Sequence, residues 1–115
     1  VVFVVPGHPD TGSNGSLIRF PWNGKITNIS ASLEIAGTDS TEIIIEKISK
    51  DGFENAEPWT NILSRSIFID YGERVDDGGH EIADDTVNAN DYFRINVLRA
   101  GISAENLVVT MQIQI

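Results

Sequence analysis

The segment LVVTMQIQI, residues 107–115, places an apolar side chain at every second position, which predicts a β-strand with one buried face. The segment NISASLEI, residues 28–35, repeats this spacing. Because successive side chains of a strand point to opposite faces, both segments should bury one face against a core. The expected buried residues are Ile29, Ala31, Leu33, Ile35, Leu107, Val109, Met111, Ile113 and Ile115.

Other segments predict strands of the same kind. FRINV (residues 93–97) alternates, while TEIIIEKI (41–48) and IFI (67–69) are rich in β-branched residues. Short strands with Gly, Asn and Asp between them, and no sustained helical periodicity, predict an all-β fold. At 115 residues the chain suits one domain, residues 1–115. We expect an antiparallel two-sheet β-sandwich of jelly-roll type.

Three local features interrupt this pattern. Ile26 is out of phase with Ile29, which predicts a bulge or bend between them. The NG pair at residues 23–24 predicts a tight primed turn. The stretch KDGFENAEP, residues 50–58, has the composition of an irregular connection between strands.

Composition excludes several classes of function. The net charge of −9 and the isoelectric point near 4.4 argue against binding to nucleic acid or to anionic membranes, so partners should be neutral or cationic. No apolar run is long enough to span a bilayer, which predicts no membrane insertion. The absence of cysteine excludes a disulfide framework and a cysteine nucleophile. The chain begins at Val1 without a methionine or a basic leader, so we interpret it as a fragment or a processed chain.

The predicted outward faces of the two strands are mostly small and neutral, and residues 107–115 carry no charge at all. These faces carry Asn28, Ser30, Ser32, Thr110, Gln112 and Gln114, where a free surface usually carries lysine and glutamate. An uncharged strand at an open sheet edge invites pairing with another chain. Residues 107–115 should therefore be central in their sheet or covered by another subunit.

The segment VDDGGHEIADD, residues 75–85, combines four aspartates, one glutamate and one histidine without a lysine or arginine. Its oxygens could hold calcium, although the spacing of an EF-hand loop is absent. A zinc site would need three or four ligands. We favour a solvated loop, with Asp76, Asp77 and His80 as candidate ligand-binding residues, no metal ligand, and calcium as the one ion left open.

Aromatic side chains in loops suggest a different kind of site. Trp22, Trp59 and Tyr71 could each offer a ring to the C–H face of a sugar, or could cap the core at a strand end. Catalysis is less well supported, because neither His8 nor His80 belongs to a nucleophile motif. The many carboxylate pairs identify no single catalytic pair. We expect a protein that is not an enzyme and has no catalytic residues.

The order of the segments resembles the jelly-roll modules of bacteriophage tail, baseplate and fibre proteins. The segments that carry the resemblance are FVVPGHPDTGSNGSLIRFPWNGKITNISASLEIAG (3–37), EIIIEKISKDG (42–52), IFID (67–70) and VNANDYFRINVLRAGISAENLVVTMQI (87–113), with Phe3, Pro6, Gly7, Phe20, Gly24, Ile26 and Ala31 in the matching places. The chain departs from the pattern at Asn90, where a glycine usually precedes Asp91, and in the insertion FENAEPW (53–59).

The resemblance implies a β-sandwich that is usually trimeric, serves a structural or host-surface-binding role, and has no defined catalytic or metal residues. We therefore expect a non-enzymatic module on the virion, a homotrimer that binds host-surface polysaccharide or attaches to other virion proteins. One alternative is a purely structural capsid or collar decoration domain. Another is a carbohydrate-binding module of a bacterial glycosidase, which would be monomeric.

Overall fold

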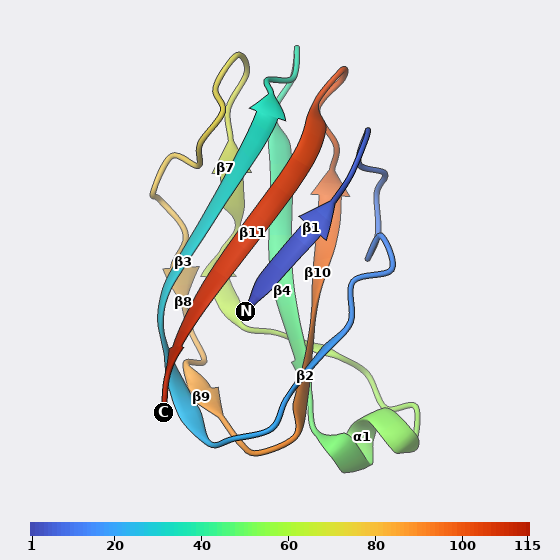
Figure 1. The fold of residues 1–115 in the computed structure, drawn as a ribbon, viewed down its shortest axis with the longest axis vertical. Coiled ribbons are helices and arrows are strands. Elements are labelled where there is room, and N and C mark those ends of the chain that lie inside the picture. Colours follow the sequence, from blue (N-terminus) through green and yellow to red (C-terminus); the bar gives the residue numbers. More distant parts are fainter.

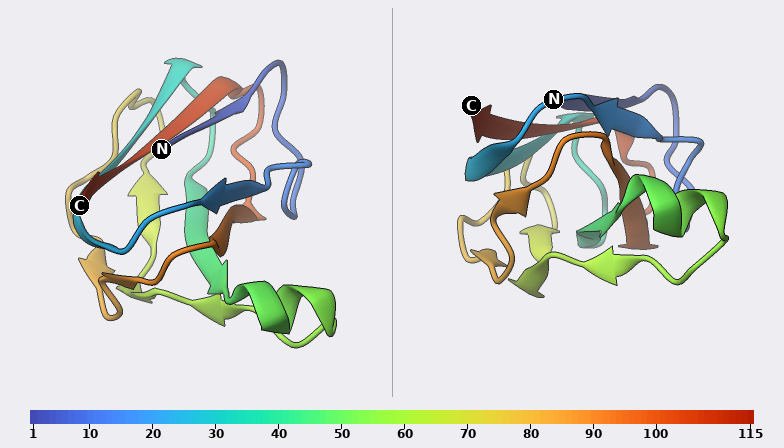
Figure 2. Two further views of the ribbon diagram at one scale, coloured as in Figure 1. Left: turned by 60° about the horizontal axis from the view of Figure 1, so that its bottom comes forward. Right: turned by 90° about the horizontal axis from the view of Figure 1, so that it is seen from below.

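The computed structural model describes residues 1–115 and consists of two antiparallel sheets that face each other (Figures 1 and 2). The first sheet has the order β1 (Val2–Val5), β11 (Glu105–Gln114), β3 (Gly24–Ile35) and β9 (Thr86–Val87). The second has the order β2 (Ile18–Phe20), β10 (Asp91–Arg99), β4 (Thr41–Ile48) and β5 (Thr60–Asn61), and β7 (Ile67–Ile69) also pairs with β4. A separate pair joins β6 (Leu63–Arg65) and β8 (Glu81–Ile82). The prediction of an all-β sandwich is confirmed.

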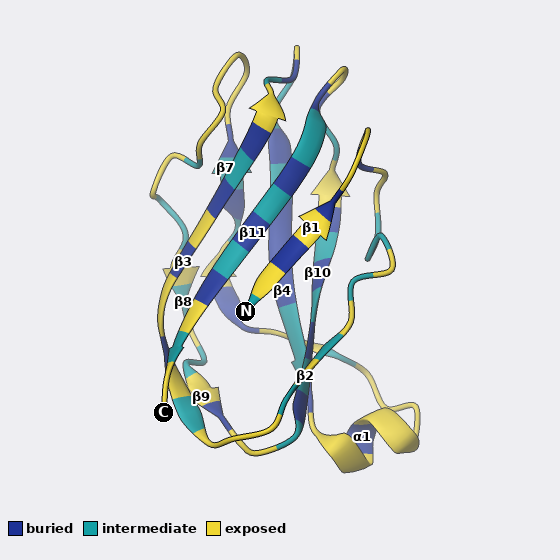
Figure 3. Ribbon diagram, in the orientation of Figure 1, coloured by how far each residue is buried: buried dark blue, intermediate teal, exposed yellow.

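The core lies between the sheets and takes every second side chain of the long strands (Figure 3). The expected residues Ile29, Ala31, Leu33, Leu107, Val109 and Met111 are buried, and Ile113 packs partly buried against the same cluster. The prediction is wrong for Ile35 and Ile115, which are 44% and 77% exposed. Both stand where the strands stop, since β3 ends at Ile35 and β11 ends at Gln114.

The expected irregularity in β3 is confirmed as a bulge. Ile26 pairs with Ile113 and Asn28 pairs with Gln112, so that Thr27 is the extra residue on its strand. The bulge places both Ile26 and Ile29 in the core, each 2% exposed, although they are three positions apart, an odd number that would put them on opposite faces of a regular strand. Residues 107–114 of β11, which carry no charge, lie between β1 and β3, and this confirms the first of the two expected arrangements, a central position in the sheet.

The prediction of a tight turn at residues 23–24 is wrong. Strands β2 and β3 belong to different sheets, and Gly24 is the first residue of β3, paired with Val87. A Cβ atom on Gly24 would lie 2.7 Å from Cγ2 of Ile113 and 2.9 Å from the carbonyl oxygen of Gln114. This glycine is needed for close packing of the first sheet and not for a turn.

The stretch predicted as an irregular connection contains a short helix, α1 (Lys50–Glu54). The Ser49 hydroxyl caps it by accepting a hydrogen bond from the Gly52 backbone N–H at 3.1 Å. The helix follows β4 directly and leads into β5, at the lower end of the sandwich in Figure 1. The structure contains no helix whose length and apolar character would let it cross a membrane.

Candidate functional site

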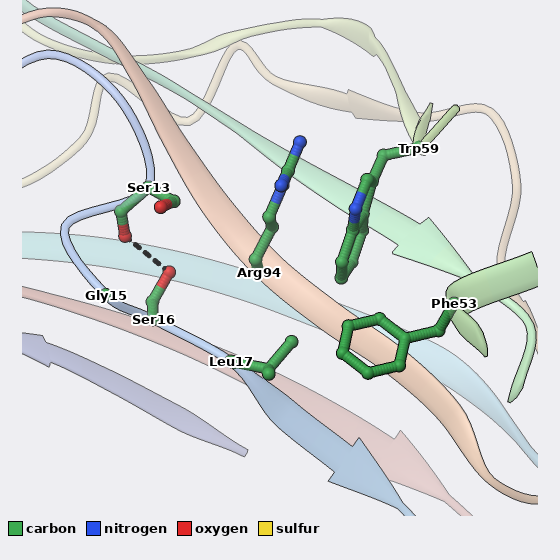
Figure 4. Close-up of a pocket in the computed structure, with 7 residues that line it drawn as sticks. All are labelled: Ser13, Gly15, Ser16, Leu17, Phe53, Trp59 and Arg94. Atoms are coloured by element: carbon green, nitrogen blue, oxygen red, sulfur yellow. Dashed lines mark hydrogen bonds between the residues drawn. The ribbon is translucent and has the colours of Figure 1, made fainter. Parts of the chain in front are cut away.

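A pocket of about 300 Å³ lies on the outer side of the second sheet (Figure 4). Strand β10 contributes one lining residue to it, and the segments before β2 and after β4 contribute the others. The lining residues are Ser13, Gly15, Ser16, Leu17, Phe53, Trp59 and Arg94. The volume is at the lower end of the range for small-molecule sites, so the pocket suits one sugar-sized unit.

Arg94 is the one charged residue that lines the pocket. It points outward because its neighbours on β10, Phe93 and Ile95, fill the core. Its Nε donates to Oε1 of Glu46 at 2.8 Å, and Glu46 is its cross-strand partner on β4. The guanidinium lies 4.2 Å from the ring centroid of Trp59, within the range of a cation–π contact. These two contacts fix the guanidinium before any ligand arrives.

An aromatic cluster forms the wall next to Arg94. Phe53 stacks on Tyr92 with centroids 4.2 Å apart and meets Trp59 edge to face at 6.2 Å. Phe53 is 38% exposed and Trp59 is half-buried. Helix α1 and the residues that follow it thus place two rings beside β10, and Figure 4 shows both side chains on the same side of the pocket.

The opposite wall is the segment before β2, which hydrogen bonds hold against β10. Gly12 and Val97 exchange two backbone hydrogen bonds at 2.9 Å. The Ser16 hydroxyl accepts from the Ile95 N–H at 3.1 Å and donates to the Ser13 carbonyl oxygen at 2.7 Å. Leu17, 49% exposed, continues this wall toward Phe53 (Figure 4). The pocket is therefore built largely in advance.

The three aromatic candidates from the sequence do not form one platform. Trp59 lines the pocket, whereas Trp22 and Tyr71 do not. Trp22 is 56% exposed in the connection between β2 and β3 and makes an edge contact with Phe20 at 5.8 Å. Tyr71 is 69% exposed after β7. The structure forms no other pocket around either of them.

The acidic segment, residues 75–85, runs between the two sheets and forms backbone hydrogen bonds with a strand of each. The Asp76 N–H donates to the carbonyl oxygen of Ala31 on β3 at 3.1 Å, and the Ala31 N–H donates to Oδ1 of Asp76 at 2.9 Å. The Asp77 N–H donates to the carbonyl oxygen of Phe68 on β7 at 2.9 Å. No residue of the segment is fully buried and about half are exposed, which fits the interpretation as a solvated loop, but the sequence did not predict that its backbone also bonds to both sheets.

The carboxylates of Asp76 and Asp77 accept hydrogen bonds from the backbone of the segment itself. Oδ2 of Asp76 accepts from Gly78 N at 3.1 Å, and Oδ1 of Asp77 accepts from Gly79 N at 2.8 Å. The His80 side chain is 11% exposed, and its Nδ1 lies 3.6 Å from Oδ2 of Asp76, too far for a hydrogen bond. No group of three or more His, Asp or Glu side chains is placed to share a metal ion.

Lys47 ties β4 to the end of the acidic segment. Its Nζ donates to Oδ2 of Asp84 and to the carbonyl oxygen of Thr86, both at 2.7 Å. The hydrogen bond from Lys47 holds the pKa of the Asp84 carboxyl below its ordinary value of 3.8. A carboxyl with a lowered pKa stabilises the fold fully above its ordinary value, and this contribution is lost as the pH falls through the lowered value.

Lys47→Met should therefore lower the free energy of unfolding by about 1 kcal/mol at neutral pH. Urea unfolding at several pH values checks this. The difference from the unchanged protein should stay constant above pH 5 and shrink below pH 4, as Asp84 is protonated. The matched control is Lys25→Met, whose partner Asp85 is 3.6 Å away and exposed, and it should change stability little. Equal losses in both variants would contradict the prediction.

Most of the pocket was not predicted from the sequence. Arg94 was expected only as an outward residue of a strand, and Phe53 only as part of an unusual insertion. The signal that could have connected them is an outward arginine beside an inserted segment with two aromatic residues, Phe53 and Trp59.

No family model, no curated protein and no solved structure matches the chain. The geometry of the pocket and the chemistry of its side chains are therefore the basis for proposing a function.

Proposed function

We propose that this protein is a non-enzymatic binding module that holds a sugar unit of a host-surface polysaccharide in the pocket beside Trp59. The observation that carries the proposal is the combination of an exposed aromatic wall with a guanidinium fixed by Glu46 and Trp59. Aromatic rings take the C–H face of a sugar, and a few fixed polar groups orient its hydroxyls.

We further propose that the domain serves on a bacteriophage virion, in a tail, baseplate or fibre, as a homotrimer. The support is the order of segments in the sequence, together with the strand order of the two sheets. The chain passes between the sheets from β1 to β2, β3 and β4, and again from β9 to β10 and β11. A four-stranded and a five-stranded sheet connected in this way favour the jelly-roll assignment. Three weak sites in one particle would gain avidity on a surface of repeated sugars.

Trp59→Ala should weaken sugar binding at least tenfold, about 1.4 kcal/mol, because it removes one ring of the wall and the surface that fixes Arg94. A glycan array would identify ligands, and calorimetry would compare the variants. Trp22→Ala is the matched control, since Trp22 is exposed outside the pocket, and it should bind like the unchanged protein. The pocket is not the site if Trp22→Ala loses binding and Trp59→Ala keeps it.

The alternatives differ in mass and in binding. Light scattering of the unchanged protein separates a homotrimer from a 12.6 kDa monomer, the state expected of a carbohydrate-binding module from a glycosidase. If the protein has the mass of a trimer and yet binds no glycan or cell-wall polymer, that result would favour the structural capsid or collar domain.

A further inference from the structure

We infer that the sugar held in the pocket carries an acetamido group, so that the ligand is an N-acetylated hexosamine unit of a polysaccharide. This inference rests on the proposed function and names the ligand class for the same site. It follows from three properties of the lining: which hydrogen bonds it can make, how apolar it is, and how its one charge is balanced.

Among the side chains that line the pocket, Arg94 offers donors alone, and the only acceptors are the hydroxyls of Ser13 and Ser16, of which that of Ser13 makes no hydrogen bond to the protein. Arg94 uses Nε on Glu46, and its two terminal nitrogens make no hydrogen bond to the protein. The Ser16 hydroxyl is already used, since it donates to Ser13 and accepts from Ile95. No Asp, Glu, Asn or Gln lines the pocket. A plain hexose presents hydroxyls that need acceptors as well as donors, whereas an amide carbonyl is a strong acceptor alone.

The same pocket offers an apolar surface for a methyl group. Leu17 and Phe53 are 49% and 38% exposed, and with Trp59 they provide the apolar part of the lining. An acetamido group carries a methyl group and a carbonyl oxygen on the same carbon atom. It can place the methyl against the rings while its oxygen accepts from the terminal nitrogens of Arg94.

The balance of charge disfavours an acidic sugar. Glu46, whose side chain is 13% exposed, already pairs with Arg94 at 2.8 Å. A ligand carboxylate would place a second negative group on the same guanidinium, in a chain whose net charge is −9. Like charges that share one site repel each other, and the carbonyl of an amide accepts the same hydrogen bonds without that cost.

The experiment compares monosaccharides that differ in one group. ¹⁵N-labelled protein is titrated with N-acetylglucosamine, N-acetylgalactosamine, glucose, galactose and glucuronic acid, and the indole N–H signal of Trp59 reports binding. The acetamido sugars should bind at least tenfold more tightly than the parent hexoses. Arg94→Lys, which loses the planar fork of donors, should reduce this preference while weak hexose binding persists. Arg74→Lys, an exposed arginine outside the pocket, is the matched control.

Two results overturn the inference but leave the proposed function. One is equal binding of hexoses and acetamido sugars, and the other is tightest binding of glucuronic acid. In each case binding must be lost in Trp59→Ala, which is measured by calorimetry because this variant has no Trp59 signal. An acetamido preference that survives unchanged in Arg94→Lys would also overturn it, because the donors would then lie elsewhere. If no sugar shifts the Trp59 signal and no glycan binds, both the proposed function and the inference fail.

Discussion

Phe93→Ala should lower the free energy of unfolding by about 3–5 kcal/mol. Phe93 lies on β10, is fully buried, and belongs to the single cluster that fills the space between the sheets. Truncation removes the apolar contacts of the ring and leaves a cavity that the surrounding strands close only in part. Urea unfolding followed by tryptophan fluorescence measures the loss.

The matched control for this substitution is Phe53→Ala, which removes the same ring from a residue that is 38% exposed. Its loss of stability should be no more than about 1 kcal/mol, whereas it should weaken sugar binding. Similar losses of stability in the two variants would mean that the two rings are equally buried in solution, which would contradict the structure. Domains of this size are stable by about 5–15 kcal/mol, so Phe93→Ala removes a large fraction of the total.

Gly101→Ala should have the second large effect, a loss of about 3 kcal/mol. A Cβ at this position would lie 2.6 Å from the carbonyl oxygen of Asp39 and 2.8 Å from Oγ1 of Thr41. The backbone must move to relieve this contact. That movement also strains the buried hydrogen bond in which the Gly101 N–H donates to Oγ1 of Thr41 at 3.0 Å. Thermal and urea unfolding of the variant check the prediction.

Thr41→Val separates the two causes of this effect. Thr41 is fully buried, and the substitution keeps its shape while it leaves the Gly101 N–H without an acceptor. Its loss should be about 1–3 kcal/mol and smaller than that of Gly101→Ala. If Gly101→Ala proves neutral while Thr41→Val is destabilising, the close packing between the β3–β4 and β10–β11 connections is not present in solution.

The strands could be predicted because their pattern is local. Alternation in β3 and β11 indicates the buried face, and the phase slip between Ile26 and Ile29 indicates the bulge at Thr27. The lack of charge in residues 107–115 predicted either a central position or cover by another subunit, and the structure has the central position. Asn90 is an instructive case: it stands where the resembled pattern has glycine, and its φ of +70° is one that asparagine adopts more readily than most residues.

The pocket and the hydrogen bonds of the acidic segment could not be predicted because they depend on distant contacts. The sequence alone does not distinguish a glycine that forms a turn from one that, like Gly24, allows close packing against β11. Ser13, Phe53 and Arg94 come from three separate segments and meet only after the second sheet has formed. The backbone hydrogen bonds of Asp76 to Ala31 have no signature in composition, so a polar segment was interpreted only as solvated.

The bonding of Asp76 and Asp77 to both sheets determines where the protein can be re-engineered. Glycine-rich polar segments are common choices for inserting an epitope or permuting the chain, and this one has both qualities. Tolerance of an insertion depends on the hydrogen bonds of the backbone that it interrupts. An insertion between these two residues would separate a strand of the first sheet, β3, from a strand of the second, β7. This acidic, glycine-containing segment is therefore a poor site for a graft.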